Sequence, residues 1–158
     1  FETLVRRHQQ RALNVAYRFL GDRHEAEDLA QEAFLRVLNA APSYRPTAKL
    51  STYLYRVLAN ACLDYRAKKR PDFSDSVPSQ TDTADAPDEA MERDERRGRV
   101  RQAIDNLPER QRMALILQHY EDMSYEEVAE AMECSKSAVD SLLVRAKRNL
   151  RDALAEEG

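Results

Sequence analysis

Apolar residues recur at steps of three and four along most of this chain, a spacing that places side chains on one face of a helix. In the first half these series cover about residues 4–20, 22–41 and 51–66. Gly21 follows the first series and Pro42 follows the second, and both residue types commonly end helices. The pattern therefore predicts three helices in the first half of the chain.

The second half shows the same helical period. One series covers about residues 89–106, and another begins at Pro108, a residue suited to the first turn of a helix, and continues to about His119. Two further series follow, over residues 125–132 and 136–154. Only three glycines and no Trp occur in 158 residues, which argues against β-rich folds. We therefore expect an all-α protein.

Capping signals separate the last two predicted helices. Ser124 has the chemistry of an N-cap, and Glu127 three residues later completes a capping box. The break from Glu133 to Lys136 offers Ser135 as a second N-cap. The final helix has one apolar stripe, which consists of Val139, Leu142, Leu143, Ala146, Leu150 and Leu154. Two helices joined by so short a break predict a helix-turn-helix.

The opposite face of the final helix is basic. From Lys136 to Arg151 there are five Lys and Arg residues against one acidic residue, Asp140. Such a face suits the phosphates of duplex DNA, although on pattern alone an ordinary solvated helix explains it equally well. Residues 1–70 are also basic, with 13 Lys and Arg against 7 Asp and Glu. The net charge of −3 does not argue against DNA binding, because a polyanion responds to the local charge of a surface and not to the total charge of the chain.

Residues 71–88 differ in composition from both halves. Pro, Ser, Thr and Asp dominate this segment and few apolar side chains occur in it. Such a composition cannot bury a core, so we expect a flexible acidic linker. The predicted architecture is two small helical domains, residues 1–70 and 89–158, joined by this linker, with the helix-turn-helix in the second domain.

Several function classes find no support in the sequence. Cys62 and Cys134 lie far apart with no further metal ligand at useful spacing, so we interpret them as reduced thiols in a cytosolic protein. The three histidines have no nucleophile, paired carboxylate or Gly-rich phosphate loop beside them, and we expect no enzyme, metal or cofactor. No apolar run reaches the length of a membrane span. The chain begins with Phe1 rather than Met, which is consistent with a missing N-terminal piece.

The third predicted helix combines aromatic, amide and basic side chains. It carries Tyr53, Tyr55, Arg56, Asn60 and Tyr65, followed by the basic tail Arg66, Lys68, Lys69 and Arg70. Rings stack on unpaired bases, amides bond to base edges and cations hold phosphates, which together suit a single strand. The alternative is that the tyrosines fill a small core with their hydroxyl groups at the surface. Taken alone, the pattern favours this alternative.

The second predicted helix presents a mixed face. Acidic, polar and apolar side chains alternate on it: Asp28, Gln31, Glu32, Leu35, Arg36 and Leu38. Such a face suits a protein partner rather than DNA. An ordinary solvated helix surface explains the same residues equally well.

Several motifs occur in a fixed order along the chain. They are Gly21-Asp22, Ala26 to Val37, Ser51 to Asn60, Leu63 to Arg66, Leu107 to Arg112 and Ser124 to Ala129. With them, residues 1–70 resemble the core-binding and promoter-melting domain of extracytoplasmic-function (ECF) sigma factors, compact bacterial members of the sigma-70 family. Residues 106–154 resemble the promoter-reading fourth region of the same proteins. The resemblance covers nearly the whole chain outside the linker.

The resemblance implies a dissociable subunit that directs RNA polymerase core to specific promoters and helps to open the DNA. It implies docking on the clamp helices of the β′ subunit through Asp28, Gln31, Glu32, Leu35 and Arg36. The loop from Pro42 to Thr52 and the third helix would hold a base flipped from the minus-ten element and its neighbouring phosphates. The residues implied in this contact are Tyr53, Arg56, Asn60, Arg66, Lys68, Lys69 and Arg70.

In the second domain the resemblance implies contacts with the minus-thirty-five element through Ser135, Lys136, Ser137, Ser141, Arg145 and Arg148. It also implies contact with the β flap of polymerase, passage of the linker through the RNA exit path, and an anti-sigma factor that could hold this cytoplasmic protein at the membrane. Two features depart from the family pattern. Tyr53 stands where Trp is common, and Asp140 and Leu142 stand where arginine is common, which weakens the expected upstream recognition.

From the residues alone, two other functions remain open. A repressor or activator would bind an operator through the helix-turn-helix and use residues 1–70 for dimerisation or sensing, which predicts a two-fold symmetric site. The basic, aromatic third helix fits that function poorly. A pure interaction protein would dock its helices on partners without touching nucleic acid.

Overall fold

The computed structural model describes residues 2–40, 50–69 and 88–157, which form seven α-helices and one π-helical turn. In chain order they are α1 (Glu2–Leu20), α2 (Arg23–Ala40), α3 (Leu50–Lys69), α4 (Asp88–Asp105), α5 (Glu109–Leu115), η3 (Ile116–Tyr120), α6 (Tyr125–Met132) and α7 (Lys136–Glu157). This composition confirms the predicted all-α fold. Most of the expected loop after Pro42 and nearly all of the expected linker lie outside the described residues.

The helices α1, α2 and α3 contact one another, and local chemistry sets the boundary between the first two. Gly21 follows α1 with a φ of 78°, a left-handed conformation that glycine adopts without a Cβ clash. Its N–H donates to the Tyr17 carbonyl oxygen over 2.8 Å. The Asp22 carboxylate then accepts a hydrogen bond of 3.0 Å from the Glu25 N–H, which caps the start of α2.

The predicted helix over about residues 108–119 differs in detail from the structure. Pro108 is the N-cap residue rather than part of the first turn, and α5 passes into the π-helical turn η3, which ends at Tyr120. Tertiary contacts accompany this change of period: the Arg18 guanidinium of α1 lies 3.9 Å from the centre of the Tyr120 ring. A local apolar period carries no information about such a contact, so the sequence pattern could not predict the turn.

The helix-turn-helix forms as predicted. Ser124 Oγ accepts from the Glu127 N–H over 3.1 Å, and the Glu127 carboxylate accepts from the Ser124 N–H over 2.9 Å, which is a complete capping box. Glu133 ends α6 with a φ of 54°. Ser135 Oγ then accepts from the Ala138 N–H over 3.0 Å and caps α7.

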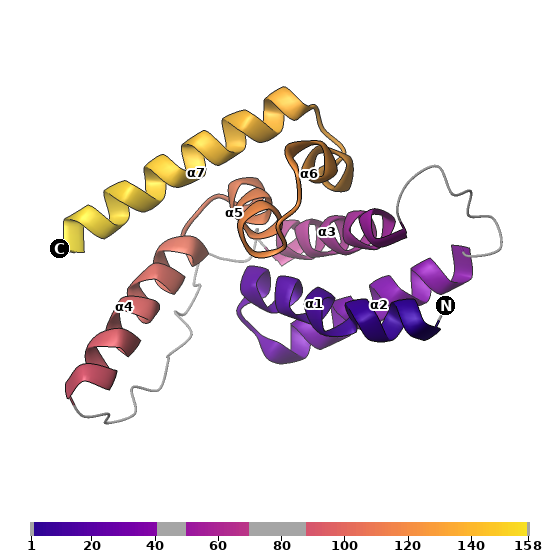
Figure 1. The fold of residues 1–158 in the computed structure, drawn as a ribbon, viewed down its shortest axis with the longest axis horizontal. Helices are drawn as coiled ribbons and strands as arrows, with labels where there is room; N and C mark the ends of the chain where they lie inside the picture. The colour runs from indigo at the N-terminus through magenta and orange to yellow at the C-terminus, as the bar shows by residue number, and fades with distance from the viewer. Residues whose placement is uncertain (1, 41–49, 70–87, 158) are drawn as a thin grey trace.

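The buried apolar residues form one core that includes both halves of the chain. Phe19, Leu54 and Leu58 from the first half and Met113 and Leu143 from the second are almost fully buried in this core. Figure 1 shows α3, α5 and α6 between α7 on one side and α1 and α2 on the other. The division into two separately folded domains therefore stays a prediction, since here the halves share their packing.

Candidate nucleic-acid and protein interfaces

Three residues of α3 that were predicted to bind a single strand share one face of the helix. Tyr53, Arg56 and Asn60 follow one another at helical steps; Arg56 is exposed, whereas Tyr53 and Asn60 are half-buried. An aromatic ring, a guanidinium and an amide thus lie close enough to contact one extended ligand. Thr52, at the start of the same helix, is buried.

Arg56 and Asn60 already have a partner in this structure. Arg56 Nε donates to Glu133 Oε1 over 3.2 Å, and Asn60 Nδ2 donates to the same oxygen over 2.5 Å. These two bonds, with Asn60 contributing more than Arg56, lower the pKa of Glu133 below its usual value. The carboxylate of Glu133, the residue that ends α6, is therefore bonded to the polar face of α3.

The basic tail of α3 is only partly free. Lys69 forms an ion pair with Glu25 of α2, and this pairing raises the pKa of Lys69. Arg66 is half-buried and its Nη2 donates to the Leu20 carbonyl oxygen over 3.5 Å. Lys68 is exposed, and Arg70 lies outside the described residues. Of the four predicted cations, Lys68 is thus the one that the structure presents to solvent without a described partner.

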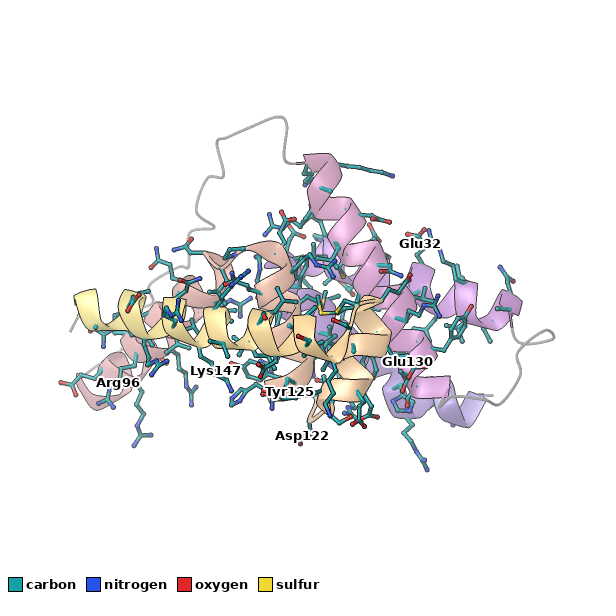
Figure 2. The ribbon with its side chains drawn as sticks, turned by 90° about the horizontal axis from the view of Figure 1, so that it is seen from above. Glu32, Arg96, Asp122, Tyr125, Glu130 and Lys147 are labelled. Atoms are coloured by element: carbon teal, nitrogen blue, oxygen red, sulfur yellow. The ribbon has the colours of Figure 1, made fainter. Side chains whose placement is uncertain are left out.

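The second helix of the helix-turn-helix, α7, presents its predicted polar face to solvent. Val139, Leu143 and Ala146 are buried, and the residues on the opposite side are exposed: Ser137, Asp140, Ser141, Arg145, Lys147, Arg148 and Arg151. Figure 2 shows the side chain of Lys147 projecting from this helix. Four of the residues predicted to contact the duplex are therefore accessible to solvent: Ser137, Ser141, Arg145 and Arg148.

Two of the predicted duplex-binding residues also have structural partners. Ser135 caps α7 with its hydroxyl group, and Lys136 Nζ pairs with Glu126 of α6 over 3.1 Å. Both Lys136 and Glu126 are well exposed, so this pair contributes little stability and can exchange for a phosphate.

The mixed face of α2 is exposed along its length. Asp28, Gln31, Glu32, Leu35 and Arg36 all lie on the surface, and the side of the helix that faces the core is lined by Ala26, Leu29, Ala30, Ala33 and Val37. Leu35 is 54% exposed and Leu38 is 42% exposed. Two exposed leucines one turn apart form an apolar strip with charged neighbours, which suits a protein partner.

One buried polar cluster was not predicted. Glu121, just after η3, accepts a hydrogen bond from Arg11 Nε over 2.9 Å and one from the Tyr55 hydroxyl group over 3.1 Å. Tyr55 is 3% exposed, and burial raises its pKa. For Tyr55 the alternative that the pattern favours, a tyrosine in the core, is confirmed, although its hydroxyl group bonds to Glu121 instead of lying at the surface. Leu54 and Tyr55 are adjacent, so their side chains leave α3 in different directions, and both are buried. Apolar side chains on more than one face of α3 could have indicated that the helix packs on two sides.

Metal binding and membrane spanning receive no support from the described residues. Within ranges 2–40, 50–69 and 88–157, His, Cys, Asp and Glu side chains form no group of three or more suited to hold a metal ion. In the same part of the chain, none of the helices has both the length and the apolar character needed to cross a bilayer.

Two known family models match the two halves of the sequence. The sequence model described as sigma-70 region 2 matches residues 4–71, and the model described as sigma-70, region 4 matches residues 97–150. The first match covers nearly all of α1 and the whole of α2 and α3. The second covers the last half of α4, all of α5, η3 and α6, and most of α7.

Curated proteins match over nearly the whole chain. RNA polymerase sigma-H factor of Pseudomonas aeruginosa is 35% identical, and the alignment covers 98% of this chain and 86% of that protein. ECF RNA polymerase sigma factor SigW of Bacillus subtilis is 30% identical, with coverage of 99% and 89%. ECF RNA polymerase sigma factor SigE of Mycolicibacterium smegmatis is 34% identical, and this chain spans 62% of its length.

Two solved structures share the fold. The sigma factor RpoE from Bartonella quintana, solved in complex with the anti-sigma factor NepR, matches with a TM-score of 0.76 and 21% identity over 98% of this chain and 96% of that one. CnrH, solved with the cytosolic domain of CnrY, matches with a TM-score of 0.75 and 21% identity over 99% and 88%. The arrangement of helices in Figure 1 is therefore one that other chains adopt.

Proposed function

The chain belongs to the ECF group of the sigma-70 family of RNA polymerase sigma factors, and from this premise we propose how its surfaces divide the work of initiation. The α2 face docks on the β′ clamp helices of polymerase core. The α3 face holds the non-template strand of the minus-ten element, and α7 reads the minus-thirty-five duplex. The chain itself catalyses nothing in this proposal.

The observation that carries the proposal is the separation of the α2 and α7 surfaces. Exposed leucines with mixed charges lie on α2, whereas exposed cations lie on α7, on the other side of the molecule. Glu32 on α2 and Lys147 on α7 mark these two surfaces in Figure 2. One small protein can therefore contact a protein and a duplex at the same time.

Linking weak sites on one chain provides the affinity. Once core is bound, the second and third contacts become intramolecular, so modest individual affinities combine into specific binding. Strand opening then requires no external energy source, because stacking and hydrogen bonds to a captured base offset an unstacking cost of a few kcal/mol.

We further propose that an anti-sigma factor regulates this chain and can hold it, as a cytoplasmic protein, at the membrane. Support comes from the two structural neighbours, of which one was solved with an anti-sigma factor and the other with a partner's cytosolic domain. The exposed apolar strip of Leu35 and Leu38 offers such a partner a surface that also serves polymerase.

Run-off transcription tests the proposal. Promoters are first identified by sequencing the DNA fragments that a mixture of this chain and polymerase core retains. We expect transcripts from these promoters only when the chain and core are both present. If core alone, or the chain alone, initiates equally well from the same fragments, the proposed function is wrong.

A further inference from the structure

A cavity of about 640 Å³ lies between α4, the end of α1 and η3, whose parent helices are labelled in Figure 1. Small-molecule sites in proteins commonly have volumes of about 300–1,000 Å³, so this cavity has room for a ligand of nucleotide size. Its described lining includes no residue of α2, α3 or α7, the helices to which the proposed function assigns its contacts. The cavity therefore has no role in that function.

The charged side chains of the cavity are mostly arginines. Arg18 comes from α1, and Arg96, Arg97 and Arg101 come from α4, whereas Asp105 is the one acidic residue of the described lining. Figure 2 labels Arg96 on its helix. Each guanidinium presents a planar fork of donors that matches the oxygens of a phosphate. Four such groups against one carboxylate suit an anion that carries several charges.

Arg18 provides a second, independent observation. Its guanidinium lies 3.9 Å from the centre of the Tyr120 ring, a contact that uses the face of the guanidinium. The N–H donors lie in the plane of that group, and the buried Nε has no hydrogen-bond acceptor among the described residues. A buried donor without an acceptor is costly, so such a group at the wall of a cavity points to an anionic ligand.

The remaining walls are apolar and aromatic. Ile104 of α4 and Ile116 of η3 are buried, and the Tyr120 ring is 37% exposed beside them. Arg96 and Ile104 are eight residues apart on α4, which corresponds to about 12 Å along the helix. The exposed cations thus lie at one end of the cavity and the buried apolar wall at the other, a division that suits a ligand with a charged part and a flat, less polar part.

We propose that this cavity binds a nucleoside polyphosphate, with the phosphate groups on the arginines and the base against Ile104, Ile116 and Tyr120. The inference goes beyond the proposed function and does not depend on it. Because the walls come from both halves of the chain, the ligand binds only where α1, α4 and η3 are together. Binding therefore stabilises this arrangement, by an amount that grows with the ligand concentration.

Isothermal titration calorimetry of the full chain tests the inference with ATP, tripolyphosphate and adenosine in buffer without Mg²⁺. We expect ATP to bind about five-fold or more tightly than tripolyphosphate, since a base that packs on an aromatic ring adds affinity, and adenosine to bind more weakly than either. Tyr120→Ala should weaken the binding of ATP by a similar factor and leave the binding of tripolyphosphate unchanged.

Two arginine variants test the phosphate contacts. Arg97→Ala should weaken ATP binding about five-fold, whereas Arg99→Ala should have no effect. Arg99 is the matched control, because it is also exposed on α4 and carries the same charge but does not line the cavity. Arg18→Met should weaken ATP binding about ten-fold, yet the melting temperature of the ligand-free chain should stay close to the wild-type value, because a buried donor without an acceptor is removed.

Several results would overturn the inference. Equal ATP affinity of Arg97→Ala and Arg99→Ala would exclude the cavity as the binding site, and so would wild-type affinity in Arg18→Met. Tripolyphosphate that binds as tightly as ATP would contradict the nucleoside contact. An excess of unlabelled duplex DNA should leave ATP binding unchanged; if the duplex displaces ATP, the arginines serve the DNA backbone and the nucleotide site is wrong.

Discussion

Arg112 of α5 donates from Nη1 to the carbonyl oxygen of Phe19 at the end of α1 over 3.1 Å, and its guanidinium lies 4.7 Å from the centre of the Phe19 ring. Arg112 is 3% exposed. Burial, followed by the nearby charge of Arg66, lowers its pKa to about 10, so the side chain stays charged at neutral pH. A buried cation thus binds the negative end of the α1 dipole and connects the two halves.

Replacing Arg112 should therefore destabilise the whole chain. We expect Arg112→Ala to lower the free energy of unfolding by about 2–4 kcal/mol, because a cavity forms and a buried carbonyl oxygen loses its donor. Arg112→Met should lose less, since it retains most of the packing and removes a buried charge. Urea denaturation measures both, and Arg99→Ala, at an exposed position of α4, should stay within about 0.5 kcal/mol of the wild type. An Arg112→Ala variant as stable as Arg99→Ala would contradict the assigned role.

Local features of the fold could be predicted from the sequence. The capping box of Ser124 and Glu127 needs only residues three apart, and the hydroxyl of Ser135 acts on the first turn of its own helix. Gly21 likewise ends α1 through its own backbone conformation. Such signals depend on the adjacent chain and not on what packs against it, which explains why all three predictions are confirmed.

The contacts between the halves could not be predicted in this way. Glu133 and Asn60 are 73 residues apart, and Glu121 and Tyr55 are 66 apart, so no helical period relates the members of either pair. Apolar positions indicated which residues are buried, but two amphipathic faces can pair in many ways. The predicted site residues on α2 and α7 are accessible as expected, whereas Arg56, Asn60 and Lys69 have partners that only the tertiary structure reveals.

Stability should fall in mild acid because of His8. Burial, and then the positive charges of Arg11 and Arg7, lower the pKa of His8 from 6.5, although Glu121 opposes this shift. The unfolded chain therefore binds a proton first as pH falls through 6.5, and the free energy of unfolding decreases there. We expect denaturation midpoints between about pH 7.5 and 5 to fall more steeply for the wild type than for His8→Gln. His24→Gln, at an exposed position of α2, should keep the wild-type slope, and an equal effect of both variants would contradict the prediction.

Core binding should depend on Leu35. Because this side chain is 54% exposed, Leu35→Asp should leave stability nearly unchanged, yet it places a charge in the proposed β′ contact. We expect the affinity for polymerase core to fall by about ten-fold or more, measured by competition with a labelled wild-type chain. Val100→Asp on α4, which is 38% exposed, is the control with the same change of chemistry. Equal core affinity of the two variants would remove Leu35 from the interface.

The basic tail of α3 should contribute to strand binding through its phosphate contacts. Replacing Lys69 and Arg70 together by Ala should lower the salt dependence of promoter-complex formation by about two counterions. Because Glu25 of α2 pairs with Lys69, Glu25→Gln should release this cation and tighten strand binding. Anisotropy titrations over a series of salt concentrations measure both effects. An unchanged slope in the double variant would exclude these two side chains from the phosphate contacts.

The duplex contact of α7 should be sensitive to salt in the same way, but independently of α3. Arg145 and Arg148 are exposed on the face opposite the buried Leu143, so both can reach phosphates without any change in the fold. Each phosphate contact contributes about −0.9 to the slope of log affinity against log salt on duplex DNA, so replacing both arginines by Ala should reduce the slope by about 1.8. The control replaces two exposed arginines of α4, Arg96 and Arg97, which matches the change in charge without touching the recognition helix. An equal fall of the salt-dependence slope in the two double variants would mean that the arginines of α7 contact the duplex no more directly than other surface arginines. The assignment of the minus-thirty-five contact to α7 would then be wrong.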